Sequence, residues 1–198
     1  MKEQKLIKVE QLLGNKYLNY YKATYQTNGK QRDYFFTSRN SLEDLAITND
    51  KIKPTAVEMF TYYKKGGKLF IAMIKEFRSP LGRYIYSFPA GLIEKDESPL
   101  VAAVREVQEE LGGKPKQVHF IQNYPLAMCA GLTDEANCLA VVELDTISEQ
   151  HLEESEDIKV EIFESHDLET KIANNELPLT ASGYLGILSI LYYNKEGK

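Results

Sequence analysis

Residues 97–113 read ESPLVAAVREVQEELGG and predict one amphipathic helix over residues 99–111. Ser98 can accept hydrogen bonds from the free amides of the first turn, and Pro99 suits the first helical position. Gly112 can adopt the left-handed conformation that ends a helix. Apolar residues recur at helical spacing and predict the face that packs on the core. They are Leu100, Val104, Val107 and Leu111.

Acidic residues form a second stripe on this helix. Glu106, Glu109 and Glu110 stand at i, i+3 and i+4, and Arg105 is four residues before Glu109, so these two can pair. Three ionised carboxylates repel one another, which water tolerates, whereas a partly buried cluster needs a cation. Carboxylate oxygens are hard ligands that suit Mg²⁺ or Mn²⁺. The spacing alone leaves two interpretations open, a solvated acidic face and a metal site.

The length of 198 residues suits one ordinary domain, or one domain with a smaller appendage. Hydrophobic residues make up 43% and charged residues 27%, which allows a sizeable core. A net charge of -5 gives no basic field for a nucleic-acid backbone, so no nucleic-acid partner is expected. The two cysteines, Cys129 and Cys138, lack the spacing of a metal site and are interpreted as reduced thiols.

The opening MKEQKLIKVE is too charged for a signal peptide. No apolar run approaches the roughly 18–20 residues that a membrane span requires. We therefore expect a cytoplasmic protein without a membrane partner.

The first 54 residues differ in character from the rest. Residues 16–38 are rich in tyrosine and contain Asn28-Gly29, which predicts a β-hairpin. The tyrosines exceed what a small hairpin can bury alone, so this sheet is expected to pack on the main body or on a second copy of the chain. Residues 39–54 are polar and indicate a connector. We therefore expect an N-terminal β-rich region over residues 1–54 and a main domain over residues 55–198.

The main domain shows strand patterns with few helices between them, which predicts a mixed sheet with helices on its faces. Residues 89–97, PAGLIEKDE, indicate a loop, and residues 179–193 predict a buried closing helix. The expected strands are 56–63, 68–77, 84–88, 117–124, 137–144 and 158–163.

The acidic helix and the loop before it resemble the Nudix box. That motif is a Gly, five residues, a Glu, seven residues, Arg-Glu, an aliphatic residue, any residue, Glu-Glu, any residue, Gly and an aliphatic residue. Here Gly113 stands at the closing aliphatic position. The other positions are filled by Gly91, Glu97, Arg105, Glu106, Val107, Glu109, Glu110 and Gly112. The resemblance implies an α/β/α sandwich around a mixed sheet, with a small N-terminal antiparallel β domain.

Further stretches resemble the ADP-ribose pyrophosphatase branch of this family. These are residues 75–94, KEFRSPLGRYIYSFPAGLIE, and the acidic residues 153–160, EESEDIKV. A tyrosine-rich N-terminal appendage also fits, since that branch forms dimers with exchanged N-terminal sheets, and it implies a homodimer. Three departures concern the substrate: Ser87 replaces a usual acid, Ala130 replaces a usual proline, and the chain has no tryptophan.

The resemblance implies a role for each matching residue. Glu106, Glu110 and the carbonyl of Ala90 would hold Mg²⁺, with Mn²⁺ as the alternative. Glu156 would be a further ligand and Glu154 the general base, although which of these two is the base stays open. A solvated acidic loop is the alternative interpretation for both.

Other motif residues are expected to support this site. Arg105 and Glu109 would assist catalysis as a pair, and Glu97 would hold Arg105 or the loop. Gly91 and Gly112 are structural members of the motif. Arg78 would contact a phosphate or ribose of the substrate, which its planar donor fork suits, while a surface arginine is the plain alternative.

The resemblance implies an enzyme that cuts the pyrophosphate bond of a nucleoside diphosphate sugar. ADP-ribose, split to AMP and ribose 5-phosphate, is the first substrate to consider. Another nucleotide sugar, a dinucleotide or an oxidised nucleoside triphosphate is the alternative within the family. A non-catalytic nucleotide-sensing module is the alternative from another class.

Overall fold

The computed structural model describes residues 4–49, 52–152, 154 and 156–195. Contacts divide the chain into two compact units. The first comprises Met1–Thr55 with Pro125–Asn137, and the second comprises Ala56–Tyr124 with Cys138–Lys198. Each unit is considered by itself.

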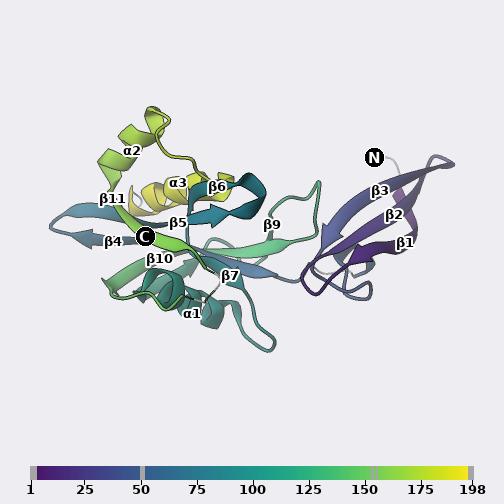
Figure 1. Ribbon diagram of the computed structural model, residues 1–198, viewed down its shortest axis with the longest axis horizontal. Helices are drawn as coiled ribbons and strands as arrows, with labels where there is room; N and C mark the ends of the chain where they lie inside the picture. The colour runs from purple at the N-terminus through teal and green to yellow at the C-terminus, as the bar shows by residue number, and fades with distance from the viewer. Residues whose placement is uncertain (1–3, 50–51, 153, 155, 196–198) are drawn as a thin grey trace. The chain divides into compact units, whose positions relative to one another are not determined.

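The first unit is built on an antiparallel sheet of three strands, β1 (Gln4–Gly14), β2 (Asn19–Thr27) and β3 (Lys30–Ser38) (Figure 1). The predicted hairpin joins β2 to β3, and its turn residues Asn28 and Gly29 take the positive φ angles, 50° and 77°, of a tight hairpin turn. Strand β1 was not predicted. Its pairing with β2 shifts register twice, so its apolar residues lack the period of two that reveals a strand.

A distant segment completes the first unit. The amide of Thr37 donates to the carbonyl of Leu132 (2.8 Å), and the Tyr34 hydroxyl donates to the carbonyl of Gly131 (2.8 Å). The carboxylate of Asp134 accepts from the amide of Ala46 (3.1 Å). Residues 125–137 therefore fold with the N-terminal sheet rather than with the strands that precede and follow them in sequence.

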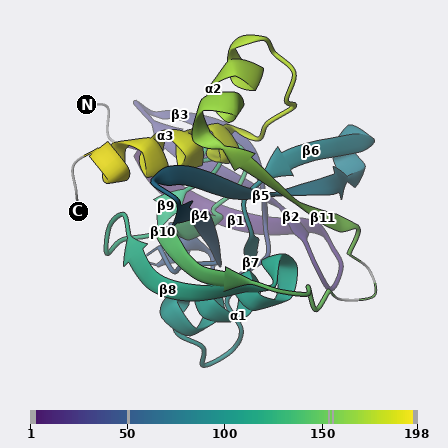
Figure 2. The ribbon, with the colours of Figure 1, turned by 90° about the vertical axis from the view of Figure 1, so that its left-hand side faces the viewer.

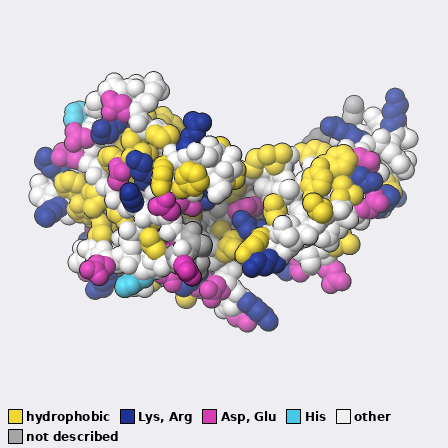
Figure 3. Space-filling model, viewed as in Figure 1, with side chains coloured by type: hydrophobic (Ala, Val, Ile, Leu, Met, Phe, Trp, Pro, Cys, Tyr) yellow, Lys and Arg dark blue, Asp and Glu magenta, His cyan; other side chains and the backbone are white. Residues whose placement is uncertain are grey.

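The two faces of the N-terminal sheet differ. Tyr21 and Phe36 stack on the buried face, with ring centroids 5.5 Å apart. Tyr20 and Phe35 stack on the other face at 6.0 Å and are 40% and 47% exposed. Hydrophobic side chains consequently gather on the surface of this unit (Figure 3).

The second unit contains most of a mixed sheet with the order β11-β5-β4-β10-β8. Strand β6 pairs with β5, β7 with β4, and β9 with the start of β10. The bounds are β4 (Ala56–Lys65), β5 (Lys68–Arg78), β6 (Arg83–Ser87), β7 (Ala90–Leu92), β8 (Gly113–Phe120), β9 (Leu126–Ala127), β10 (Ala136–Ile147) and β11 (Ile158–Glu164).

Helices cover both faces of this sheet (Figures 1 and 2). Helix α1 (Pro99–Leu111) lies on one face, and α2 (Ser165–Ala173) and α3 (Ala181–Lys195) lie on the other. Two short 3-10 helices, Ala46–Thr48 and Ser79–Leu81, complete the described elements. The expected α/β/α sandwich with a small antiparallel N-terminal sheet is confirmed.

Side chains along β4 point alternately to the two faces of the sheet and contribute to two separate cores. Val57 and Met59 point to the core beneath α1, while Phe60 and Tyr62 point to the core beneath α2 and α3. Each side therefore has its own apolar layer, as a sheet buried on both faces requires. The first of these layers supports the acidic helix.

Some elements differ from those expected. Strand β7 lies inside residues 89–97, which were predicted as a loop, because three residues are too few for a strand pattern. Helix α2 was not predicted, because only Leu168 of this helix is buried and its apolar period is weak. Strand β8 starts at Gly113, four residues before the expected 117. No helix in the described part of the chain is long and apolar enough to cross a membrane.

Candidate active site

Helix α1 begins and ends as its sequence predicts. The Ser98 hydroxyl accepts from the amide of Val101 (3.3 Å), Pro99 opens the helix, and Gly112 ends it in the left-handed conformation (φ 66°). The predicted apolar stripe is right for Val107 and Leu111, which are fully buried.

The prediction that Leu100 faces the core is wrong, because this side chain is 50% exposed. The buried face instead includes Ala102 and Ala103, whose small side chains let the helix approach the sheet closely. Gly113, the departure from the box, is buried, and a Cβ there would lie 2.9 Å from Val107 and 3.1 Å from Leu144. An aliphatic side chain would have no room at this position.

Arg105 is the centre of an ion-pair network at the start of the site. Its guanidinium binds Glu97 through two nitrogens (both 3.0 Å), and Nη1 also reaches Glu106 (2.6 Å) and Glu109 (3.0 Å). Nη2 donates to the carbonyl of Leu92 (3.1 Å). The carboxylates raise the pKa of Arg105, Glu97 most strongly. One cation thus holds three acids and the preceding loop together, including the Arg105–Glu109 pair expected from their spacing.

The loop that carries Glu97 is fixed at the same time. The Glu97 carboxylate accepts from the amide of Glu94 (3.0 Å), and the Glu97 amide donates back to the Glu94 carbonyl (3.1 Å). Hydrogen bonds from Arg105 and then from the Glu94 amide lower the pKa of Glu97. Glu97 therefore holds both Arg105 and the loop, the two alternatives that the sequence left open.

Two carboxylates of α1 are buried against strand β7. The amide of Ala90 donates to Glu110 (2.9 Å). A Cβ built on Gly91 would lie 1.8 Å from Glu106 Oε1, so only a glycine leaves space for this carboxylate. Glu106 and Glu110 are 8% and 5% exposed. The backbone of residues 90–91 therefore lies directly against the oxygens of the two acids.

Burial shifts the acidity of this pair. Desolvation, followed by the charge of Glu106, raises the pKa of Glu110 to about 8, against the opposing hydrogen bond from Ala90. Desolvation also raises the pKa of Glu106, although Arg105 lowers it. The charge of Glu156 also raises the pKa of both Glu106 and Glu110. A buried set of repelling carboxylates is the environment in which a divalent cation relieves the strain.

The structure separates the two acids of residues 153–160. Glu156 is half-buried and electrostatically coupled to the carboxylates of α1, whereas Glu154 is exposed. The charge of Glu156 therefore acts on the cluster. Glu154 lies on the surface of the same loop.

Arg78 ends strand β5 next to two acids that the sequence analysis missed. It pairs with Glu76 (2.7 Å) and is partly exposed. Desolvation raises the pKa of Glu76, which Arg78 opposes and Glu156 reinforces. Glu58 is 4% exposed, and burial raises its pKa to about 7. Glu58 could have been noticed in the sequence as a charged residue inside an otherwise apolar strand. Glu76 could have been noticed because it stands two residues before Arg78, on the same side of the strand.

The donor set fits a hard divalent cation. Glu106, Glu110 and Glu156 would supply carboxylate oxygens, and the backbone of Ala90 lies against Glu110. In the described part of the chain, no three acids already stand together as a complete metal site, so a cation would have to draw these groups together. Oxygen ligands of this kind are preferred by Mg²⁺ and Mn²⁺. The missing side chain at Gly91 gives the Glu106 carboxylate the space that it occupies against the backbone.

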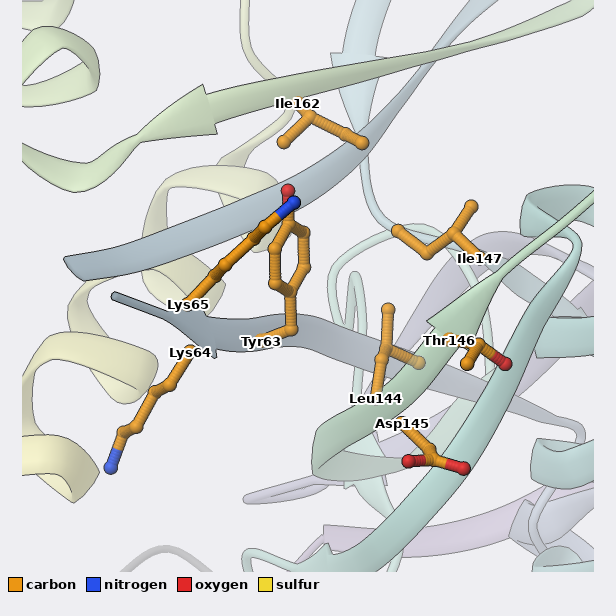
Figure 4. A pocket seen from close by; sticks show the side chains of 8 residues that line it. All are labelled: Tyr63, Lys64, Lys65, Leu144, Asp145, Thr146, Ile147 and Ile162. Atoms are coloured by element: carbon orange, nitrogen blue, oxygen red, sulfur yellow. The ribbon is translucent and has the colours of Figure 1, made fainter. Parts of the chain in front are cut away.

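A separate hollow of about 520 Å³ lies at the ends of β4 and β10 (Figure 4). Figure 4 shows Lys64 and Lys65 projecting in different directions from β4. Its one carboxylate, Asp145, already pairs with Lys114 (3.4 Å). The hollow lacks a group of acids, so it does not compete with the cluster on α1 as a site for a cation.

We predict that the metal-free protein loses stability as the pH rises from about 5 to 8. The pKa of Glu110 is about 8 in the folded chain, above its ordinary value of 4.5. The folded state therefore binds this proton more tightly, and the stability it gives is full below pH 4.5 and is lost as the pH rises through 8. The loss is on the order of 5 kcal/mol, because each of the roughly 3.5 pKa units between 4.5 and 8 is worth about 1.4 kcal/mol.

Urea unfolding in EDTA at a series of pH values measures this loss. Glu110→Gln should flatten the dependence without abolishing it, because Glu58, with a pKa of about 7, contributes with the same sign. An equal slope in wild type and Glu110→Gln would contradict the cost assigned to ionising Glu110.

Comparison with known proteins identifies the family. The family model of the NUDIX domain matches residues 52–182. A Bacillus subtilis (strain 168) ADP-ribose pyrophosphatase is 33% identical over 130 residues, covering 62% of this chain and 68% of that protein. A Mus musculus ADP-sugar pyrophosphatase is 52% identical over 44 residues, covering 22% of this chain and 20% of that protein.

Two further comparisons concern the share of a relative that this chain covers and the fold that it shares with a solved structure. A Caenorhabditis elegans protein named as a nudix hydrolase is 32% identical over 124 residues, and this chain spans 55% of its length. A crystal structure of an ADP compounds hydrolase superposes with a TM-score of 0.72, covering 98% of this chain and 96% of that chain at 18% identity, which shows the fold alone. Since the NUDIX match covers more than half of its residues, this chain belongs to the Nudix family.

Proposed function

We propose that this chain is a Mg²⁺-dependent pyrophosphohydrolase that cleaves the diphosphate of a nucleoside diphosphate sugar. With ADP-ribose the products are AMP and ribose 5-phosphate. The observation that carries the proposal is the buried group of Glu106 and Glu110 beside Ala90 and Gly91, held by Arg105. Nudix hydrolases use divalent metal ions, and this group has the oxygen donors that such ions require.

The substrate class is supported by the names of relatives. The Bacillus subtilis and mouse proteins are named ADP-ribose and ADP-sugar pyrophosphatases. Ser87, Ala130 and the absence of tryptophan depart from the ADP-ribose branch, so another nucleotide sugar, a dinucleotide or an oxidised nucleoside triphosphate is the alternative substrate. A non-catalytic sensing module is disfavoured, because the carboxylates of the box are complete.

Each acid has a proposed part in the reaction. Glu106, Glu110, Glu156 and the carbonyl of Ala90 would hold Mg²⁺, which neutralises diphosphate charge and orients the attacking water. Arg105 keeps one oxygen of Glu106 in place while Glu109 and Glu97 fix Arg105. Glu154 would take the proton of the water on its carboxylate. Arg78, which is partly exposed, would donate to a phosphate or ribose oxygen.

A substrate panel tests the proposed function. The protein is incubated with Mg²⁺ and nucleotide sugars, dinucleotides or oxidised nucleoside triphosphates, and the products are identified by mass. We predict cleavage of a nucleotide sugar to a nucleoside monophosphate and a sugar phosphate, with kcat at least about a hundredfold lower in Glu106→Gln and Glu110→Gln. Glu169→Gln, an exposed acid on α2, is the control and should keep wild-type turnover. Binding without product from any compound would support the sensing alternative instead.

A second experiment separates the general base from the metal ligands. Glu154→Gln should lower kcat by about a hundredfold, the usual contribution of a general base, while the affinity for Mn²⁺ stays near that of the wild type. Glu156→Gln should weaken Mn²⁺ binding as well. Wild-type turnover in Glu154→Gln would remove this residue from the mechanism, and a loss of Mn²⁺ binding would make it a ligand.

We also propose a homodimer formed through the N-terminal region. The exposed Tyr20–Phe35 stack supports this, because a monomer would leave this apolar surface in water. Phe35→Asp should turn a dimer into a monomer in light scattering, with Lys30→Asp in the same strand as the control. A wild-type protein with the mass of a monomer would overturn the proposal.

A further inference from the structure

Residues 148–151 contact the end of helix α1 and precede the acidic loop, which is the segment between them and β11 that carries Glu154 and Glu156. The amide and hydroxyl of Ser148 both donate to the carbonyl of Gly112 (2.8 and 3.0 Å). The side-chain amide of Gln150 donates to the carbonyl of Glu110 (2.5 Å). Carbonyls in the last turn of a helix have no partner within the helix, so these bonds satisfy them.

One of these bonds involves the backbone of a proposed metal ligand. Gln150 holds the carbonyl of Glu110, and the amide of His151 donates to the carbonyl of the neighbouring Glu109 (2.8 Å). The chain that leads to Glu154 and Glu156 therefore starts from the same helical turn that carries the acidic cluster.

The far end of the acidic loop is held by β5 and β6. The Tyr84 hydroxyl donates to the carboxylate of Asp157, and the amide of Phe77 donates to the Asp157 carbonyl (3.4 Å). The rings of Tyr84 and Phe77 meet edge to face, with centroids 5.4 Å apart. Asp157 directly follows Glu156, so this contact fixes the backbone beside that acid.

Glu156 is thus placed between two anchors. Its charge raises the pKa of Glu106 and Glu110 on α1 and of Glu76 on β5. Its position depends on the backbone to which it is attached, and that backbone is held at Gln150 on one side and at Asp157 on the other.

We propose that Tyr84 and Gln150 are positioning residues that set the acidic loop, and with it Glu156, against the carboxylates of α1. The proposal rests on the function proposed above. Neither residue belongs to the Nudix box. Each acts through a side-chain hydrogen bond at one end of the loop, and partners of this kind govern how well a metal ligand is oriented.

The Tyr84 anchor can be removed without disturbing the packing. Tyr84 is 38% exposed, and its ring would keep the contact with Phe77 in Tyr84→Phe. The variant therefore deletes one hydroxyl and its bond to Asp157. Its urea unfolding midpoint should match that of the wild type, which separates positioning from a general loss of structure.

The first experiment compares Tyr84→Phe and Gln150→Ala with matched controls. We expect each variant to lower kcat on the cleaved nucleotide by about tenfold, as loss of an orienting partner does, with KM changed less than twofold. Titration with Mn²⁺ followed by electron paramagnetic resonance should show about tenfold weaker binding. Tyr192→Phe and Gln108→Ala, both exposed, should leave kcat and Mn²⁺ binding unchanged.

A double-mutant cycle then tests the route through Glu156. If Tyr84 acts through this acid, Tyr84→Phe should add less than a twofold loss of kcat in a Glu156→Gln background. Asp157→Asn keeps an acceptor for Tyr84 and should retain activity, whereas Asp157→Ala should reproduce the loss.

Two outcomes overturn the proposal. One is wild-type kcat and Mn²⁺ affinity in both Tyr84→Phe and Gln150→Ala. The other is an equal loss from Tyr84→Phe with and without Glu156→Gln. A wild-type protein that cleaves no compound of the panel contradicts the proposed function instead, and the Mn²⁺ titrations still decide the positioning role.

Discussion

The ion pairs of Arg105 are the interaction on which the site depends. Acids on one helical surface repel each other, and Glu106 also pays the cost of burial. A single guanidinium offsets part of that cost by binding Glu97, Glu106 and Glu109 while its remaining donor fixes the loop at Leu92. A lysine has one compact charge and could not connect these partners in the same way.

Glu110 differs from Glu106, because no lysine or arginine of the described residues acts on its carboxylate. Its carboxylate accepts from the amide of Ala90, and burial raises its pKa to about 8, so at neutral pH the ionised form is costly without further positive charge. The absence of a side chain at Gly91 leaves the oxygens of Glu106 against the backbone. Under the proposed function, the helix, the short strand β7 and the residues around Glu156 would form a place where a divalent cation would stabilise both the fold and the charge of a diphosphate.

The sequence predicted the parts of this arrangement that depend on local spacing. The caps of α1, the pairing of Arg105 with Glu109 and the hairpin at Asn28-Gly29 all follow from neighbours within a few residues. It did not predict contacts that depend on tertiary structure. Glu76 joins the charged surroundings of the cluster only because β5 lies beneath α1, whereas Glu58 lies on the other face of the sheet, where Ser182 of α3 is its hydrogen-bond partner. Residues 125–137 fold with a sheet about ninety residues earlier in the chain. Strand β1 was hidden by its two register shifts, and Leu100 lies outside the core because alanines face the sheet.

The central claim is that these acids hold a divalent cation against a diphosphate. The most direct measurement is anomalous diffraction from crystals soaked with Mn²⁺ and a non-hydrolysable nucleoside diphosphate sugar. The account predicts anomalous peaks beside Glu106, Glu110 and the carbonyl of Ala90, in contact with the diphosphate oxygens. Peaks located elsewhere, with the diphosphate bound away from α1, would contradict it.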